Sequence, residues 1–206
     1  MLTTVVRGLF AAFIACFLVP AQAGTLVILG DSLSDAYNMP REAGWVYRLD
    51  QRLGAEHSVI DAAISGDTSA GALSRIDEVL ARHQPDALIV ILGGNDGLRG
   101  LSPSALEANL DGILQRAADA GARLALMQIR IPPNLGPVYI ERFEAIYPRL
   151  AARHDAELLA FFLEDLFDRD GMMMADGIHP SEAAQPILAE RMEPVARQLL
   201  EPTTSD

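Results

Sequence analysis

Two short segments of this chain carry the residue types of a serine nucleophile and its base. Gly30-Asp31-Ser32 directly follows the apolar run 25–29, which places a serine at the carboxyl end of a predicted buried strand. Far along the sequence, Asp176 stands three residues before His179. A serine hydroxyl is a poor nucleophile and needs a neighbouring base, which an imidazole supplies near neutral pH. The pattern predicts a serine hydrolase in which Asp176 fixes the tautomer of His179.

The negative charge that develops on a substrate carbonyl oxygen during acyl transfer needs hydrogen-bond donors. We expect three donors, which are the backbone N–H of Ser32, the backbone N–H of Gly66 and the side-chain amide of Asn95. The segments that hold Gly66 and Asn95, 65–69 and 93–97, each follow a predicted strand. Parallel strands bring such turns to one edge of a sheet, so the donors are expected to meet there.

Each motif is weak when taken alone, because Asp, Ser and Gly are common turn residues. Asp176 and His179 can also be two metal ligands. No third His, Cys or carboxylate cluster stands at ligand spacing, so we expect neither a metal nor another cofactor. The other histidines fall at the ends of predicted elements and are expected to be solvated: His57, His83 and His154. The joint occurrence of the motifs, in order and at one sheet edge, favours the hydrolase interpretation.

The elements that must position these residues alternate between apolar runs of strand length and amphipathic runs of helical period. Strands are predicted over 25–30, 57–64, 86–92, 124–131 and 156–162. Helices are predicted over 42–53, 70–83, 104–120, 138–153 and 182–200. Pro186 is expected to bend the last helix unless that helix begins later. Strands separated by helices of ten or more residues predict right-handed crossovers and one parallel sheet covered on both faces, in an α/β domain.

Residues 1–23 have the order of a secretory signal peptide. Arg7 precedes the apolar run 9–19, and Ala21-Gln22-Ala23 has the small-x-small pattern of a cleavage site, so cleavage is expected after Ala23. A membrane anchor is the alternative, but a spanning helix needs about 20 apolar residues and this run is shorter. Lipid attachment at Cys16 is disfavoured because apolar residues continue past it. We expect a periplasmic or secreted protein without a stable membrane anchor.

Residues 24–206 are enough for one domain with a substantial apolar core. Cys16, the only cysteine, lies within the predicted signal, so disulfides cannot stabilise that domain. The chain has a formal net charge of −12, which becomes −13 when the signal and its single Arg are removed. Such a charge repels nucleic acid and anionic membrane surfaces. We expect a monomer that acts on a small-molecule substrate and does not bind nucleic acid.

The four segments together resemble the ordered blocks of the SGNH (GDSL) hydrolase superfamily, which is named after Ser, Gly, Asn and His. The matching residues are Ser32, Gly66, Asn95, and His179 with Asp176. Three further segments are similar to the bacterial periplasmic branch that unites thioesterase, arylesterase and lysophospholipase activities: 93–100, 127–130 and 145–148. The resemblance covers essentially all of residues 24–206.

This resemblance implies a flavodoxin-like, three-layer α/β/α sandwich whose five parallel strands have the order 2-1-3-4-5. It also implies a catalytic triad of Ser32, Asp176 and His179, with the three oxyanion donors named above. In that branch the loop after the asparagine block moves when an acyl chain binds, and here that loop is 97–102. We expect an acyl pocket walled partly by Leu98, Leu101 and the loop 131–137.

The expected activity is hydrolysis of acyl esters and thioesters, as by an arylesterase or lysophospholipase, through an acyl-enzyme on Ser32. Two alternatives stay open. A carbohydrate O-deacetylase on the same fold would show no rise in kcat/KM beyond acetyl esters. A non-catalytic lipid-binding module would keep the fold without the activity, although the intact Ser32, Asp176 and His179 argue against it.

Overall fold

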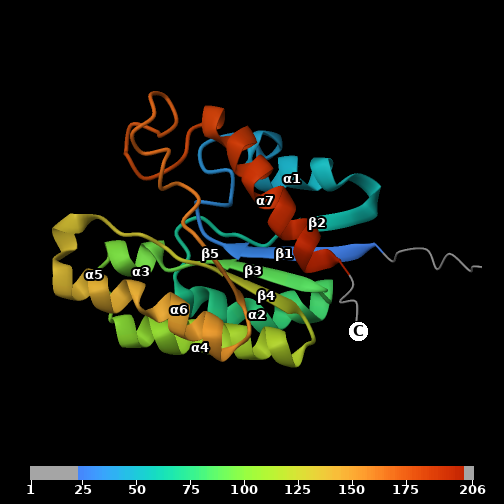
Figure 1. The fold of residues 1–206 in the computed structure, drawn as a ribbon, viewed down its shortest axis with the longest axis horizontal. Helices are drawn as coiled ribbons and strands as arrows, with labels where there is room; N and C mark the ends of the chain where they lie inside the picture. The colour runs from blue at the N-terminus through green and yellow to red at the C-terminus, as the bar shows by residue number, and fades with distance from the viewer. Residues whose placement is uncertain (1–22, 202–206) are drawn as a thin grey trace, which may run out of the picture.

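The computed structural model describes residues 23–201, so the predicted signal peptide, apart from Ala23, lies outside the described residues. Five strands form one parallel sheet in the order β2-β1-β3-β4-β5, as the resemblance implied (Figure 1). Their bounds are β1 Gly24–Gly30, β2 His57–Asp61, β3 Ala87–Ile91, β4 Arg123–Met127 and β5 Glu157–Leu159. The predicted fold class and strand order are confirmed.

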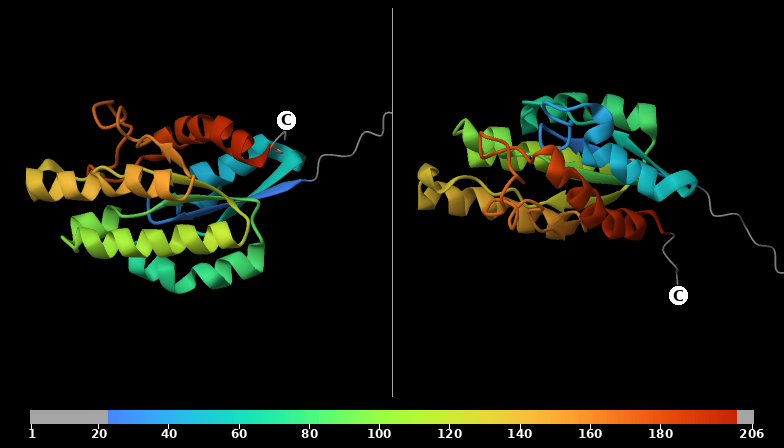
Figure 2. Two further views of the ribbon diagram at one scale, coloured as in Figure 1. Left: turned by 60° about the horizontal axis from the view of Figure 1, so that its bottom comes forward. Right: turned by 90° about the horizontal axis from the view of Figure 1, so that it is seen from above.

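Helices cover both faces of this sheet, which gives the three layers. α1 and α7 pack together on one face, and α2 and α4 pack together on the other, with α6 beside α4 (Figures 1 and 2). The helix bounds are α1 Trp45–Leu53, α2 Ser69–His83, α3 Gly94–Leu98, α4 Pro103–Asp119, α5 Pro137–Glu144, α6 Ile146–Arg153 and α7 Gln185–Leu200. Within residues 23–201, no helix is both long enough and apolar enough to span a membrane.

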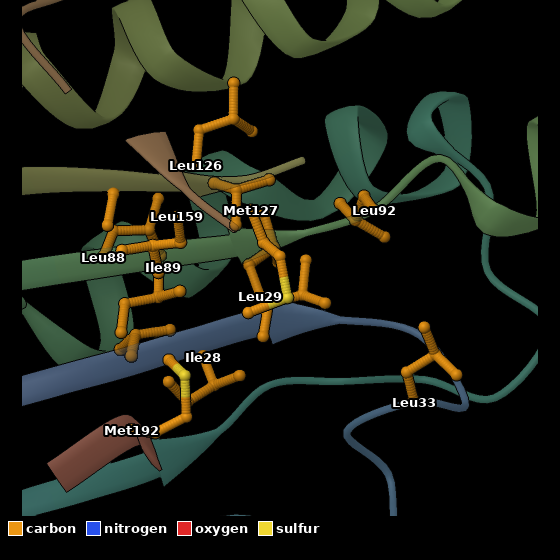
Figure 3. Packing of buried hydrophobic residues seen from close by; sticks show 14 of the residues in the cluster. Ile28, Leu29, Leu33, Leu88, Ile89, Leu92, Leu126, Met127, Leu159 and Met192 are labelled. Carbon is orange, nitrogen blue, oxygen red and sulfur yellow. The ribbon is translucent and has the colours of Figure 1, made fainter. Parts of the chain in front are cut away.

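The core lies on both sides of the central strands, because parallel strands covered by helices on two faces are apolar at every position. All five residues of β3 are buried, as is most of β1. Figure 3 shows side chains from four strands interdigitating in this core, with α7 contributing from one side. The residues labelled there include Ile28 and Leu29 of β1, Leu88 and Ile89 of β3, Leu126 and Met127 of β4, Leu159 of β5 and Met192 of α7. This rigid core positions the turns at the carboxyl ends of the strands.

Proline and glycine divide or shorten three of the predicted helices. The expected helix 42–53 begins as a 3-10 turn, Arg41–Ala43, and becomes α-helical only after Gly44. The expected helix 138–153 is two helices, α5 and α6, because Pro148 has no N–H to donate to the carbonyl of Glu144. The last helix begins at Gln185, so Pro186 falls in its first turn, where the missing N–H costs no hydrogen bond.

Three predicted strands end earlier than their apolar runs. The run 57–64 is a strand only to Asp61, the run 124–131 only to Met127, and the run 156–162 only over Glu157–Leu159. The residues that were predicted to be strand but are not lie mainly at the carboxyl ends of the strands, where the chain continues into the loops around the site. Beyond β4, Ile129 and Ile131 are apolar because they line a cavity rather than continue the strand.

Candidate active site

Three turns at the carboxyl edge of the sheet bring the first predicted site residues together. Ser32 follows β1, Gly66 lies in the turn after β2, and Asn95 lies in α3, directly after β3. Because β2, β1 and β3 are neighbours in the sheet, their turns lie side by side. The loop between β5 and α7, orange in Figure 1, rises at the same edge and carries His179. All four residues line one cavity of about 520 Å³.

A continuous hydrogen-bond chain joins the three residues predicted to be catalytic. His179 Nε2 lies 2.8 Å from Ser32 Oγ, and His179 Nδ1 lies 2.7 Å from Asp176 Oδ2. Both distances are within hydrogen-bonding range, so a proton can pass from the serine hydroxyl to the imidazole. The order hydroxyl, imidazole, carboxylate is the one that acyl transfer by a serine requires.

The turn that holds Asp176 and His179 is braced by its own backbone. Asp176 Oδ1 accepts hydrogen bonds from the N–H groups of Ile178, at 2.9 Å, and His179, at 3.0 Å. Gly177 between them has φ 67°, a left-handed conformation that glycine adopts without strain. Desolvation acts to raise the pKa of Asp176, but these N–H groups and the imidazole outweigh it and lower the pKa to about 2. The carboxylate is therefore ionised at neutral pH and well below it.

The three residues predicted to supply oxyanion donors line the same cavity. Within residues 23–201, neither the N–H of Ser32 nor that of Gly66 donates a hydrogen bond to the protein, so both are available as donors. Gly66 has φ 80°, which again suits glycine. The Asn95 amide is oriented by its neighbours, since its Nδ2 donates to Asp31 at 3.2 Å and its Oδ1 lies 3.5 Å from an Arg99 nitrogen.

Apolar side chains form most of the cavity wall beside this polar cluster. Leu98, predicted to bind substrate, lies on the wall, whereas Leu101 does not line the cavity. The Leu101 carbonyl instead accepts a hydrogen bond from the Tyr139 hydroxyl at 2.7 Å. The loop 131–137 contributes only its first three residues. The apolar lining residues are Leu33, Leu98, Ile129, Ile131, Pro132, Pro133, Phe161, Phe167 and Ile178. Such a wall suits a hydrocarbon chain better than a sugar.

Comparison with known proteins assigns the chain to a family. The model of the GDSL-like Lipase/Acylhydrolase family matches residues 28–186, which is most of the chain and includes every residue of the predicted site. This chain belongs to the GDSL family. The expected membership, and with it the expected class of serine ester hydrolase, is confirmed.

Relatives of this GDSL hydrolase carry the activities that the sequence segments indicated. Thioesterase 1/protease 1/lysophospholipase L1 of Escherichia coli is 48% identical over 179 residues, covering 87% of this chain and 85% of the relative. Esterase TesA of Pseudomonas aeruginosa is 46% identical over 183 residues, covering 87% and 91%. The crystal structure of the psychrotrophic esterase EstA from Pseudoalteromonas sp., inhibited by monoethylphosphonate, superposes with a TM-score of 0.82 at 38% identity, covering 86% and 98%.

Asp31 is a buried group of this GDSL hydrolase that the sequence reasoning left unused. Its side chain is 1% exposed, and burial raises its pKa to about 6 despite hydrogen bonds from the Leu33 N–H and the Asn95 amide. A carboxylate accepts and cannot donate, so ionised Asp31 fixes which end of the Asn95 amide faces it. The signal available in the sequence was its place directly after a buried strand.

A second buried network behind the site also escaped the sequence reasoning. Asp96 accepts hydrogen bonds from the Ser69 N–H at 2.9 Å and the Ser69 hydroxyl at 2.6 Å. Asn109 donates to the same hydroxyl at 2.9 Å. These contacts tie the start of α2 to α3 and α4, and so hold the element that carries Asn95. Each residue is unremarkable in sequence, because only the fold brings the three together.

The prediction that the other histidines are solvated is wrong for His154. Its side chain is 5% exposed, and its Nε2 lies 2.7 Å from a carboxylate oxygen of Asp111 in α4. The ring is covered because α6 packs against α4 at that point. Within residues 23–201, no three His, Cys, Asp or Glu side chains are grouped to hold a metal ion.

Proposed function

We propose that this GDSL hydrolase cleaves acyl esters and thioesters through an acyl-enzyme on Ser32. The observation that carries the proposal is the unbroken chain from Ser32 through His179 to Asp176, with contacts of 2.8 and 2.7 Å, beside an apolar cavity. The names of the relatives, which include esterase, thioesterase and lysophospholipase, support the same substrate classes.

The geometry supports a two-step reaction in which every proton has a place. Ser32 Oγ attacks the acyl carbonyl carbon as its proton moves to His179 Nε2, while the Nδ1–H donates to Asp176. The oxyanion then accepts hydrogen bonds from the N–H groups of Ser32 and Gly66 and from the Asn95 amide. The ester C–O or thioester C–S bond breaks as the imidazolium gives its proton to the leaving oxygen or sulfur. Water, deprotonated by His179, then attacks the acyl carbon. The bond from that carbon to Ser32 Oγ breaks as the imidazolium returns its proton to Oγ, and the acid is released.

We propose that the acyl chain lies along the apolar wall that includes Leu98, and this predicts a dependence on chain length. Across p-nitrophenyl esters from C2 to C16, kcat/KM is expected to rise beyond acetyl by up to about fourfold per added methylene, until the cavity is filled. Leu98→Ala is expected to lower the ratio of octanoyl to acetyl kcat/KM several-fold, because it removes part of the wall.

The matched comparison is Leu101→Ala, since both leucines are about equally exposed, at 43% and 41%, and lie three residues apart, Leu98 at the end of α3 and Leu101 in the loop that follows it. Because Leu101 does not line the cavity, its effect on the ratio is expected to be smaller. If Leu101→Ala lowered this ratio more than Leu98→Ala, the acyl chain would lie on the other side of the loop. A flat chain-length profile for the unchanged protein would favour the O-deacetylase alternative.

We also propose that residues 1–23 direct export to the periplasm or the medium, and that the processed protein is a monomer. The support is the order of charge, apolar run and cleavage pattern, together with a fold whose first strand begins at Gly24, so that cleavage leaves every described element intact. N-terminal sequencing of the exported protein is expected to read Gly24-Thr25-Leu26. Light scattering is expected to give the molar mass of a single chain. Residues 1–23 retained in the membrane fraction would support an anchor instead.

A further inference from the structure

Tyr37 covers one face of the imidazole that is proposed to act as the base. The ring centroids of Tyr37 and His179 are 4.0 Å apart and their planes differ by 22°, so the rings are stacked. Tyr37 is half-buried and lines the same cavity. The two imidazole nitrogens are held within the ring plane by Ser32 and Asp176. These two hydrogen bonds leave the imidazole free to rotate about the line that joins its nitrogens. A ring stacked on its face limits that rotation.

The backbone around Tyr37 is held in an unusual conformation. Ala36 has φ 43° and Asn38 has φ 56°, and left-handed backbone is unfavourable for residues with a Cβ. They are two of only four non-glycine residues with positive φ within residues 23–201. Such conformations persist where the surrounding structure enforces them, and they gather at functional positions. Tyr37, whose ring stacks on His179, thus lies between two residues with left-handed backbone.

Contacts of neighbouring residues hold the segment around Tyr37 in place. The Asp35 carboxylate accepts a hydrogen bond from the Ser65 N–H at 2.8 Å, which ties the segment to the turn that carries Gly66. Upstream, the Trp45 indole donates to the Leu33 carbonyl at 2.9 Å. Both of these contacts precede Tyr37, and a turn closes the segment across it, in which the Met39 N–H donates to the Ala36 carbonyl at 3.1 Å.

We propose that Tyr37 is a positioning residue for His179, and that its ring also stabilises the imidazolium formed when Ser32 is deprotonated. The electron-rich face of an aromatic ring attracts a cation that lies within about 6 Å of its centroid. A stacked ring that limits tilting keeps Nε2 aimed at the serine oxygen. The inference rests on the proposed function, since it requires His179 to be the base.

Two carboxyl groups interact with this imidazole, Asp176 at Nδ1 and buried Asp31, and Arg130 lines the same cavity. Burial raises the pKa of Asp31 to about 6, so Asp31 changes its charge within the acid part of the pH profile. Both carboxyl groups are present in every variant of Tyr37. A difference in pH profile between these variants therefore reports the aromatic ring.

Three substitutions of Tyr37 distinguish the contribution of its aromatic ring from those of its bulk and its hydroxyl. Tyr37→Phe keeps the ring and is expected to retain kcat and the pH profile. Tyr37→Leu keeps much of the bulk without the π system, and is expected to lower kcat about tenfold and to move the acid limb of kcat/KM about half a pH unit lower. The shift is downward because an imidazolium without the ring loses its proton more readily. Tyr37→Ala is expected to lower kcat at least as much as Tyr37→Leu does.

The experiment measures kcat, KM and the pH profile with a p-nitrophenyl ester, and checks each variant by thermal melting. Tyr47→Leu is the matched control, because Tyr47 lies exposed on α1, away from the cavity, and is expected to change none of these quantities. A kcat and acid limb for Tyr37→Leu equal to those of the unchanged protein would overturn the inference. An equal loss in Tyr37→Phe would also overturn it, since the hydroxyl would then be the active group. Activity that survives in Ser32→Ala would instead overturn the proposed function.

Discussion

Ser32→Ala is expected to lower kcat for ester hydrolysis about a million-fold, because it removes the hydroxyl oxygen that lies 2.8 Å from His179 Nε2. His179→Ala is expected to cost a similar factor, since the hydroxyl then has no base. The double variant is expected to be no worse than either single variant, because the two side chains act as one unit. The measurement is the rate of p-nitrophenyl ester cleavage, followed for hours at high enzyme concentration.

Ser34→Ala is the matched control for this prediction. Ser34 belongs to the same turn, and its buried hydroxyl has no hydrogen-bond partner within residues 23–201, so its removal is expected to leave the rate unchanged. A fluorophosphonate probe, which reacts with activated serines, is expected to label the unchanged protein and Ser34→Ala but not Ser32→Ala. Labelling that persists in Ser32→Ala would mean that another serine reacts, and the site would have to be assigned again.

Asp176→Asn is expected to lower kcat about ten-thousand-fold while leaving the fold intact. The asparagine amide would donate to Nδ1 and so place the imidazole proton on Nε2, where it blocks acceptance of the serine proton. The carboxylate, with its pKa of about 2, is ionised throughout the working range and stabilises the imidazolium. Asp176→Ala, which cannot fix the wrong tautomer, is expected to move the acid limb of kcat/KM to lower pH, because the imidazolium loses that stabilisation.

Asp170→Asn is the matched control, which tests whether a loss of kcat is specific to position 176. Asp170 is exposed on the same loop and does not line the cavity, so its substitution is expected to change kcat by less than twofold. If Asp176→Asn lost less than about tenfold, the carboxylate would not be orienting the base. The role would then belong to another group, and Asp31 would be the first to test.

The sequence predicted the layers and the strand order well because their signals are local or come with the family resemblance. A buried parallel strand is apolar at every position, and a surface helix shows its period in any window of the chain. The predictions failed where proline or glycine interrupts a pattern, as at Gly44 and Pro148. They also failed where an apolar run leaves the sheet to line the cavity, as at Ile129. Hydrophobicity alone does not distinguish these two uses of the same residue type.

The amino-acid pattern was enough to predict the candidate catalytic residues and the sheet edge where they meet, because the ends of buried strands can be recognised from runs of apolar residues. The folded chain was needed to show that His179 lies between Ser32 and Asp176, that Asp31 is buried beside them, and that Tyr37 stacks on the imidazole. Those contacts join segments far apart in the chain, and the aim of Tyr37 depends on left-handed backbone that no local pattern announces. Contacts of this kind exist only once the core has fixed the distances between the turns.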